Sequence, residues 1–124
     1  MVFTNYGAQA LIWRLGSALG SVYVDTFAVG SGSGTALIGN TTLVNEFSRI
    51  QITGSPDFTT ARKVTFTADF ASTTLSGTQI LEFGLFQSGP ANIGSTWQRE
   101  GFGSIVFDGT SELQIISTIE AIPG

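Results

Sequence analysis

The sequence predicts a mostly β chain: an antiparallel β-sandwich or barrel of about six to seven strands with one N-terminal amphipathic helix. From residue 22 onward apolar and polar residues alternate, as half-buried strands require. These runs are short and separated by Gly, Ser and Thr turns, which is typical of sandwiches and barrels. No linker, charge block or internal repeat divides the chain, so we expect a single domain over residues 1–124.

The helical periodicity covers residues 5–19. Five apolar residues recur there at spacings of three and four, so they share one face of a helix: Ala8, Leu11, Ile12, Leu15 and Leu19. Thr4 or Asn5 can cap the start of this helix, and Gly20 can end it. We expect the helix to lie on the sheet through this face, or to present Trp13 to a partner.

Strands are expected in six runs, at residues 22–29, 48–53, 62–71, 79–86, 96–107 and 112–122. In the third run Val64, Phe66, Ala68 and Phe70 share the inward face. In the last run the inward face holds Leu113, Ile115, Ser117 and Ile119.

The run at residues 79–86 is mostly apolar on both faces. Leu81, Phe83 and Leu85 are expected on one face and Ile80, Glu82 and Phe86 on the other. This pattern predicts a central strand, or one covered by a partner.

The segments between these runs predict loops and turns. Residues 35–47 are expected to form a loop with a helical turn near residues 43–47. Residues 72–78 are expected to form a turn, and residues 88–95 a long loop. Asp108 and Gly109 predict a tight hairpin, because an Asp-Gly pair tolerates positive φ.

The charge content is unusually low. Charged residues make up 11% of the chain, against about 25% in a typical soluble domain. A surface of Ser, Thr, Asn, Gln and Gly can pack against neighbours without burying unpaired charge, so it favours an assembly subunit. The five basic residues are scattered, which argues against nucleic-acid binding and against an anionic membrane surface. No apolar run reaches the roughly 18 residues of a membrane span.

The residue types present argue against catalysis. Cys and His are absent, which excludes thiolate nucleophiles, His-based metal sites and an imidazole base. Asp25, Glu82 and Glu100 are the carboxylates nearest to apolar residues, but nothing in the sequence brings two of them together for acid–base work. The glycines of residues 30–34 lack the lysine of a phosphate-binding loop. We therefore expect no enzyme activity, no cofactor and no metal.

Two tryptophans are the candidate interface anchors. Ten phenylalanines are expected mostly in the core, whereas Trp13 and Trp97 are expected to be exposed, since tryptophan is enriched at interface hot spots. Leu37 and the segments 35–45 and 88–96 complete the expected interface. The same tryptophans could instead stack on sugars, so a carbohydrate-binding β-sandwich is the alternative from another functional class.

Seven short segments follow one another along the chain: Asn5–Gly7, Ala28–Gly32, Leu43–Arg49, Val64–Phe70, Glu82–Phe86, Arg99 with Phe102, and Leu113–Ile119. They include the patterns Ala-x-Gly-x-Gly, Leu-x-Asn-Glu-x-x-Arg and Glu-x-Gly-Leu-Phe. In this order they resemble the N-terminal module of phage tail fibres, which occurs in contractile-tailed phages and related virion proteins. The resemblance covers nearly the whole chain. It implies that Glu46, Arg49, Glu82 and Arg99 form structural ion pairs; Glu82 would need such a partner if buried, and either arginine could supply it.

A fibre continues into a shaft and a receptor-binding tip, whereas this sequence ends at Gly124. We therefore expect a capsid decoration or cement subunit that stabilises a particle by surface burial. A tail, baseplate or tail-fibre attachment module is the alternative. The expected partners are further copies of the chain, with a trimer favoured, and the major capsid protein or tail and baseplate proteins. The expected location is the virion, after synthesis in the host cytoplasm.

Overall fold

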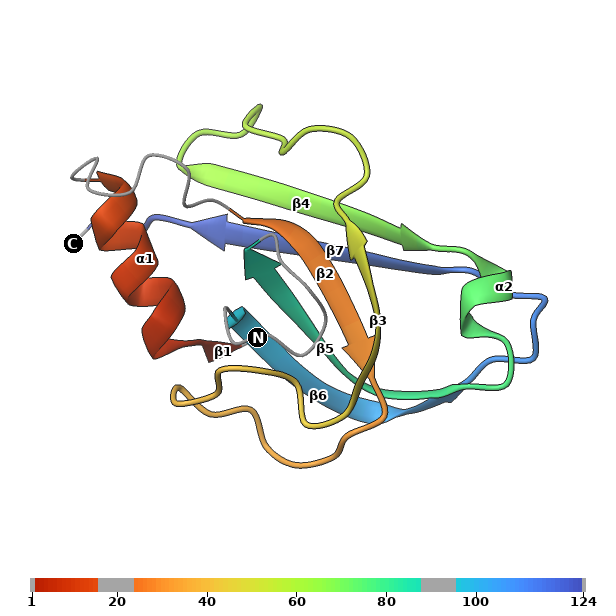
Figure 1. Cartoon of the computed structure of the whole chain (residues 1–124). Coiled ribbons are helices and arrows are strands. Elements are labelled where there is room, and N and C mark those ends of the chain that lie inside the picture. Colours follow the sequence, from red (N-terminus) through yellow and green to blue (C-terminus); the bar gives the residue numbers. More distant parts are fainter. Residues whose placement is uncertain (1, 16–23, 88–95, 124) are drawn as a thin grey trace.

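The computed structural model describes residues 2–15, 24–87 and 96–123 (Figure 1). Its elements are β1 (Val2–Phe3), α1 (Asn5–Leu15), β2 (Val24–Gly30), β3 (Glu46–Gln51), β4 (Lys63–Phe70), α2 (Ser72–Leu75), β5 (Gln79–Gln87), β6 (Thr96–Val106) and β7 (Leu113–Glu120). All strand pairs among them are antiparallel. The predicted mostly β fold with an N-terminal helix is confirmed. The expected loop at residues 88–95 and the expected helix end at 16–19 lie outside the described residues.

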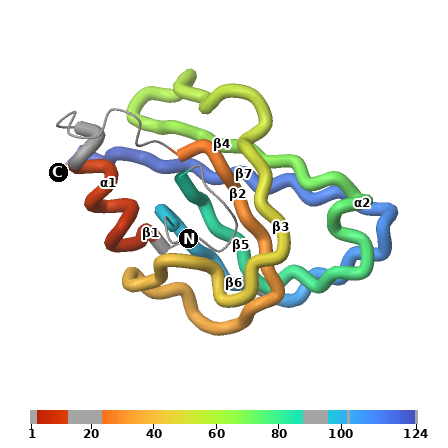
Figure 2. Tube along the Cα trace, in the orientation of Figure 1, coloured from red at the N-terminus to blue at the C-terminus, as the bar shows by residue number. Residues whose placement is uncertain are grey.

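The strands form two open sheets that pack as a sandwich-like pair. One has five strands in the order β1-β6-β5-β2-β3, and the other has two, β4 and β7. Figures 1 and 2 show β4 and β7 side by side along one side of the molecule, with α1 at the end near the C-terminus. The main core lies between the sheets and includes Phe27, Phe66, Leu85 and Ile115. This arrangement is the sandwich and not the barrel among the predicted alternatives.

The period-two pattern correctly predicts the inner faces of the two-stranded sheet. In β4, Phe66, Ala68 and Phe70 are buried, and in β7, Ile115 and Ser117 are buried. The alternate residues of both strands are more exposed. A strand with one buried face must alternate in this way, because successive side chains point to opposite sides of the sheet.

The predicted central strand is β5, which pairs with β2 on one edge and β6 on the other. Phe83 and Leu85 lie on the main core face, as expected. Ile80 was expected on the opposite face, and this is wrong: Ile80 is fully buried in the same main core. The reason is an irregularity in the pairing with β6 between Ile80 and Glu82, which changes the alternation at Leu81.

The predicted buried face of the N-terminal helix is also wrong. Leu11 and Ile12 are 48% and 61% exposed, whereas Ala10 is fully buried. Gly7 lies so close to β6 that a Cβ on it would stand 2.7 Å from the backbone oxygen of Trp97. The helix therefore contacts the sheet through small residues, which allow the two backbones to approach, and turns larger apolar residues outward.

Three smaller predictions about the connecting segments are wrong. Residues 72–75 form α2, whose Leu75 is fully buried, so they are not a plain turn. No helical turn forms at residues 43–47, where β3 begins at Glu46. Asp108 and Gly109 do not close a hairpin, because β6 and β7 belong to different sheets. Gly109 still takes the positive φ of 94° that the turn between the sheets requires.

Thr4 caps α1 and ties it to β6. Its Oγ1 accepts a hydrogen bond from the N–H of Gly7 at 3.0 Å and donates to the backbone oxygen of Thr96. The residue is fully buried. The cap therefore satisfies one of the free N–H groups of the first helical turn and anchors that turn to the sheet.

Replacing Thr4 with alanine should lower the free energy of unfolding by about 1–2 kcal/mol, because it removes the cap and leaves the Thr96 carbonyl without this donor. Thr4→Ser keeps the hydroxyl and should retain most of the stability. Urea denaturation of the two variants measures the difference. Equal losses in both would show that the methyl group, and not the hydroxyl, matters here.

Candidate functional site

The connection between β2 and β3, residues 31–45, covers the outer face of the five-stranded sheet, and we call it the cover segment. In β2, Phe27 faces the main core, so its neighbour Ala28 faces the other way. Ala28 and Phe86 are fully buried there against Leu43 of the cover segment. The sheet therefore has a second, smaller core beneath this segment.

Two charged side chains, Glu82 of β5 and Arg99 of β6, are buried in this second layer. Both residues are buried, and Arg99 Nη2 lies 3.8 Å from Glu82 Oε2. Across the two paired strands Glu82 stands opposite Gly101, and Arg99 stands opposite Gly84. Each charged side chain thus faces a glycine, which leaves room for the two to meet diagonally.

The buried charges hold the cover segment in place. The N–H of Val44 donates to Glu82 Oε1 at 2.6 Å. Arg99 Nη1 donates to the Thr35 carbonyl and to Asn40 Oδ1, each at 3.3 Å. One carboxylate and one guanidinium therefore bind the cover segment at three points along its length.

The bonding of this pair is incomplete. Glu82 Oε2 and the Nε and Nη2 of Arg99 are buried without a hydrogen-bond partner in the described part of the chain. At 3.8 Å the contact between the two side chains is an ion pair and is too long for a hydrogen bond. Each charge is therefore balanced mainly by the other, and removal of either would leave its partner uncompensated.

Glu46 and Arg49 form a second pair, within β3. Arg49 donates from Nε to Glu46 Oε2 at 2.9 Å and from Nη2 to Oε1 at 2.7 Å. The Arg49 guanidinium also lies 4.1 Å from the centre of the Phe86 ring, in a cation–π contact. The four charged residues singled out from the sequence thus lie in two pairs, with Glu82 beside Arg99 and not beside Arg49. The bidentate, nearly buried geometry of the Glu46–Arg49 pair suits a structural role.

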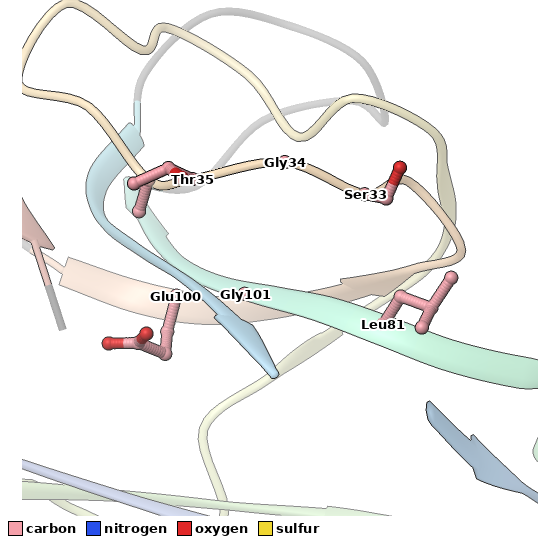
Figure 3. Close-up of a pocket in the computed structure, with 7 residues that line it drawn as sticks. Ser33, Gly34, Thr35, Leu81, Glu100 and Gly101 are labelled. Atoms are coloured by element: carbon pink, nitrogen blue, oxygen red, sulfur yellow. The ribbon is translucent and has the colours of Figure 1, made fainter. Parts of the chain in front are cut away.

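A pocket of about 410 Å³ lies between residues 33–36 of the cover segment and the strands β5 and β6. Figure 3 shows that the carboxylate of Glu100 and the hydroxyl of Ser33 point away from each other. Asp25 and Glu82 do not line this pocket. The pocket therefore lacks the facing carboxylates of a glycosidase. Within the described residues no group of three or more acidic residues could hold a metal ion.

The carboxyl groups with lowered pKa values lie in exposed turns. The pKa of Asp57 is lowered by hydrogen bonds from the N–H and then the hydroxyl of Thr59. The pKa of Asp108 is lowered by the hydroxyl and then the N–H of Thr110, at 2.6 and 2.9 Å. Both are turns in which an aspartate bonds the backbone two residues on, so these shifts belong to turn structure.

Trp97 is not exposed, so the expectation that it forms an exposed anchor is wrong. Only 5% of the residue is exposed, and its ring packs 6.2 Å from that of Phe3 within the main core. Its burial depends on the contact with Phe3 of β1 and on a register shift of β6 beside it, which sequence alone could not determine. A buried indole cannot serve as a sugar platform. The side chain of Trp13 lies outside the described residues.

Leu37 lies on the cover segment and is 59% exposed, as its candidate interface role requires. The expected interface segment 35–45 also contains Ile38 and Val44, which are exposed, whereas sequence reasoning missed most of the remaining exposed apolar residues. Among the described residues, the large apolar side chains that face solvent are Leu11, Ile12, Leu37, Ile38, Val44, Phe47, Phe58, Ile105, Val106, Ile116 and Ile122. Among the exposed apolar residues outside residues 35–45, Ile116 had a usable signal, since alternation in the last strand predicts that it points outward.

No protein-family model matches the chain, and no curated protein matches its sequence. None of the described helices has both the length and the apolar character needed to cross a membrane.

Proposed function

We propose that this chain is a structural subunit of a phage-like virion, namely a capsid decoration or cement protein that stabilises the particle by surface burial. The observation that carries the proposal is the surface: among the described residues eleven large apolar side chains face solvent. The whole chain has only five basic and nine acidic residues. Exposed apolar area with so little charge is typical of surfaces that are covered in an assembly.

The cover segment is the part of this surface best suited to docking. Leu37, Ile38 and Val44 are 59%, 63% and 64% exposed and lie on the same segment. The bonds from Glu82 and Arg99 hold that segment to the sheet. Side chains already held in position lose less conformational entropy on binding, so a neighbour would gain more from contacting them.

The partners follow from this role. The chain would contact further copies of itself, with a trimer favoured, and the major capsid protein; its location would be the virion, after synthesis in the host cytoplasm. Placement on the tail or baseplate is the alternative, because the same surface would suit docking to that scaffold. Neither role requires catalysis, a cofactor, nucleic acid or a membrane.

The number of copies per particle tests the proposal. Quantitative mass spectrometry of purified virions would compare this chain with the major shell protein. Hundreds of copies are expected for a decoration subunit. A handful, in multiples of three or six, would overturn the capsid placement in favour of the tail. Absence of the chain from particles would overturn both placements.

A matched pair of variants ties that measurement to the cover segment. Leu37→Lys places a charge on the proposed docking surface and should lower the number of copies per particle. Ile122→Lys is the control, because Ile122 is 81% exposed and lies outside the cover segment. Equal occupancy for both variants would contradict docking through this segment.

A further inference from the structure

The two-stranded sheet has one covered edge and one uncovered edge. On the outer edge of β4, the N–H of Thr53 donates to the Thr67 carbonyl at 2.7 Å. Asp57 and Thr65 exchange two backbone hydrogen bonds there, each of 2.9 Å. On the outer edge of β7, no strand of the described chain is paired.

The register shows which backbone groups of β7 reach its outer edge. Thr65 and Thr67 direct their backbone bonds away from β7, and they stand opposite Thr118 and Ile116. In an antiparallel ladder the residues of such a pair are not hydrogen-bonded to each other. The backbone N–H and C=O groups of Thr118 and Ile116 therefore point away from β4, toward the outer edge of β7. The same alternation extends along the strand. The residues that present N–H and C=O groups at the outer edge are therefore Gln114, Ile116, Thr118 and Glu120.

This edge lacks the features that normally prevent strands from pairing. β7 pairs with β4 over eight consecutive positions without a register shift, so no bulge bends it. The strand contains no proline and no lysine, which are common ways to block an edge. Ile116 is 60% exposed on it. A long, regular and nearly uncharged edge is a template for another strand.

We propose that this edge is where two copies of the chain associate, with their β7 strands paired antiparallel about a two-fold axis at Ser117. The inference rests on the proposed assembly function and names its self-association surface. A two-fold contact closes as a dimer, so it replaces the trimer favoured above. In this register the four outward-facing residues meet one another. Ile116 stands opposite Thr118 of the second copy, and Gln114 stands opposite Glu120 of the second copy.

In this register the outward side chains of β7 are complementary to those of a second copy, which argues for that occupant. Gln114 Nε2 donates one N–H to Asp69 Oδ1 at 2.8 Å and has a second N–H for the Glu120 carboxylate of the other copy. Glu120 also lies 4.0 Å from Lys63 of its own copy. A two-fold axis at Ile116 would instead place Glu112 opposite Glu120 and bring like charges together. The axis at Ser117 avoids this repulsion and uses the whole strand.

The surroundings of the edge are compatible with a second copy. A pocket of about 290 Å³ near the start of β7 is lined by Gln114 and by apolar side chains that include Phe83 and Ile105. A pocket of about 730 Å³ near its end includes Leu11 and Phe58. Because the strands would run antiparallel, the start of one would lie beside the end of the other. The pair would form one continuous four-stranded sheet, in the order β4-β7-β7-β4.

The double variant Ile116→Lys/Thr118→Lys tests the proposal. In this register each new lysine faces a lysine of the second copy, so two like-charge pairs form across the edge. The inner face of β7 is unchanged, and both replaced side chains are exposed, so the fold should persist. We expect wild-type chain to be dimeric by sedimentation velocity and the variant to raise the dimer Kd at least about tenfold. Circular dichroism would verify that the variant is folded.

Ile12→Lys is the matched control, since Ile12 is 61% exposed, nearly the same as Ile116, but lies on α1 and outside both β7 and the cover segment. It should leave self-association unchanged. A monomeric wild-type chain, or a dimer or trimer that persists in the double variant, would overturn the β7 proposal. If the chain is nevertheless present in particles, the proposed function stands without the β7 pairing. Absence from particles would overturn the function whatever the oligomeric state.

Discussion

Replacing Arg99 with methionine is expected to lower the free energy of unfolding by about 3–5 kcal/mol. Methionine fills much of the same volume but leaves Glu82 buried without its countercharge. The two side chains are 1% and 0% exposed, so water cannot compensate. The variant also loses the bonds to Thr35 and Asn40 that hold the cover segment. Urea denaturation monitored by tryptophan fluorescence would measure the loss.

Lys63→Met is the matched control for this change. Lys63 pairs with Glu120 at 4.0 Å, and the two side chains are 39% and 42% exposed. A solvent-exposed pair contributes about 0–1 kcal/mol, so its loss should be small. If Arg99→Met were no more destabilising than Lys63→Met, the buried pair would not stabilise the fold.

A double variant separates the charge from the hydrogen bonds. Adding Glu82→Gln to Arg99→Met removes the uncompensated charge and keeps an oxygen that can accept from the N–H of Val44. It should recover most of the lost stability if the isolated carboxylate is the main cause. No recovery would instead assign the loss to the bonds from Arg99 to Thr35 and Asn40.

Sequence patterning predicted the sheet strands well where one face alone is buried. Phe66 and Phe70 in β4 and Ile115 in β7 alternate with outward residues, and a one-residue slip would reverse every side chain. The helix face could not be predicted in the same way. It depends on how closely α1 approaches β6, and close approach selects Gly7 and Ala10 over Leu11.

The candidate site was only partly predictable for a related reason. Glu82 interrupts an apolar run, which marks it as a charge that needs a partner when buried. Its choice of Arg99 over Arg49 depends on which strands are neighbours, and sandwiches with the same strand pattern can differ in strand order. Trp97 shows the same limit, because its burial depends on the pairing of β1 with β6, which is a property of the topology.

The close contact between the cover segment and the buried pair leads to a last expectation, for Gly32→Ala. A Cβ at Gly32 would overlap Glu82 Oε2 and the Cβ of Val44, and would lie 2.8 Å from the backbone nitrogen of Asn45. Since one of these neighbours is backbone and another is a buried ion-paired oxygen, they cannot move aside freely. The variant should lose about 1–3 kcal/mol of unfolding free energy. The amide of Val44 should also exchange with solvent faster, because its bond to Glu82 would lengthen.

Gly39→Ala is the control within the same segment, because a Cβ there meets nothing within 4 Å and Gly39 does not have positive φ. This change should leave stability unaltered or raise it by up to about 1 kcal/mol, since alanine restricts the unfolded chain. Hydrogen exchange at Val44 should remain as in the wild type. Equal effects of the two variants would mean that the cover segment lies loosely on the sheet. A loss confined to Gly32→Ala would instead show that it packs directly against the Glu82–Arg99 pair, so that the apolar side chains it presents are held in place before any partner binds.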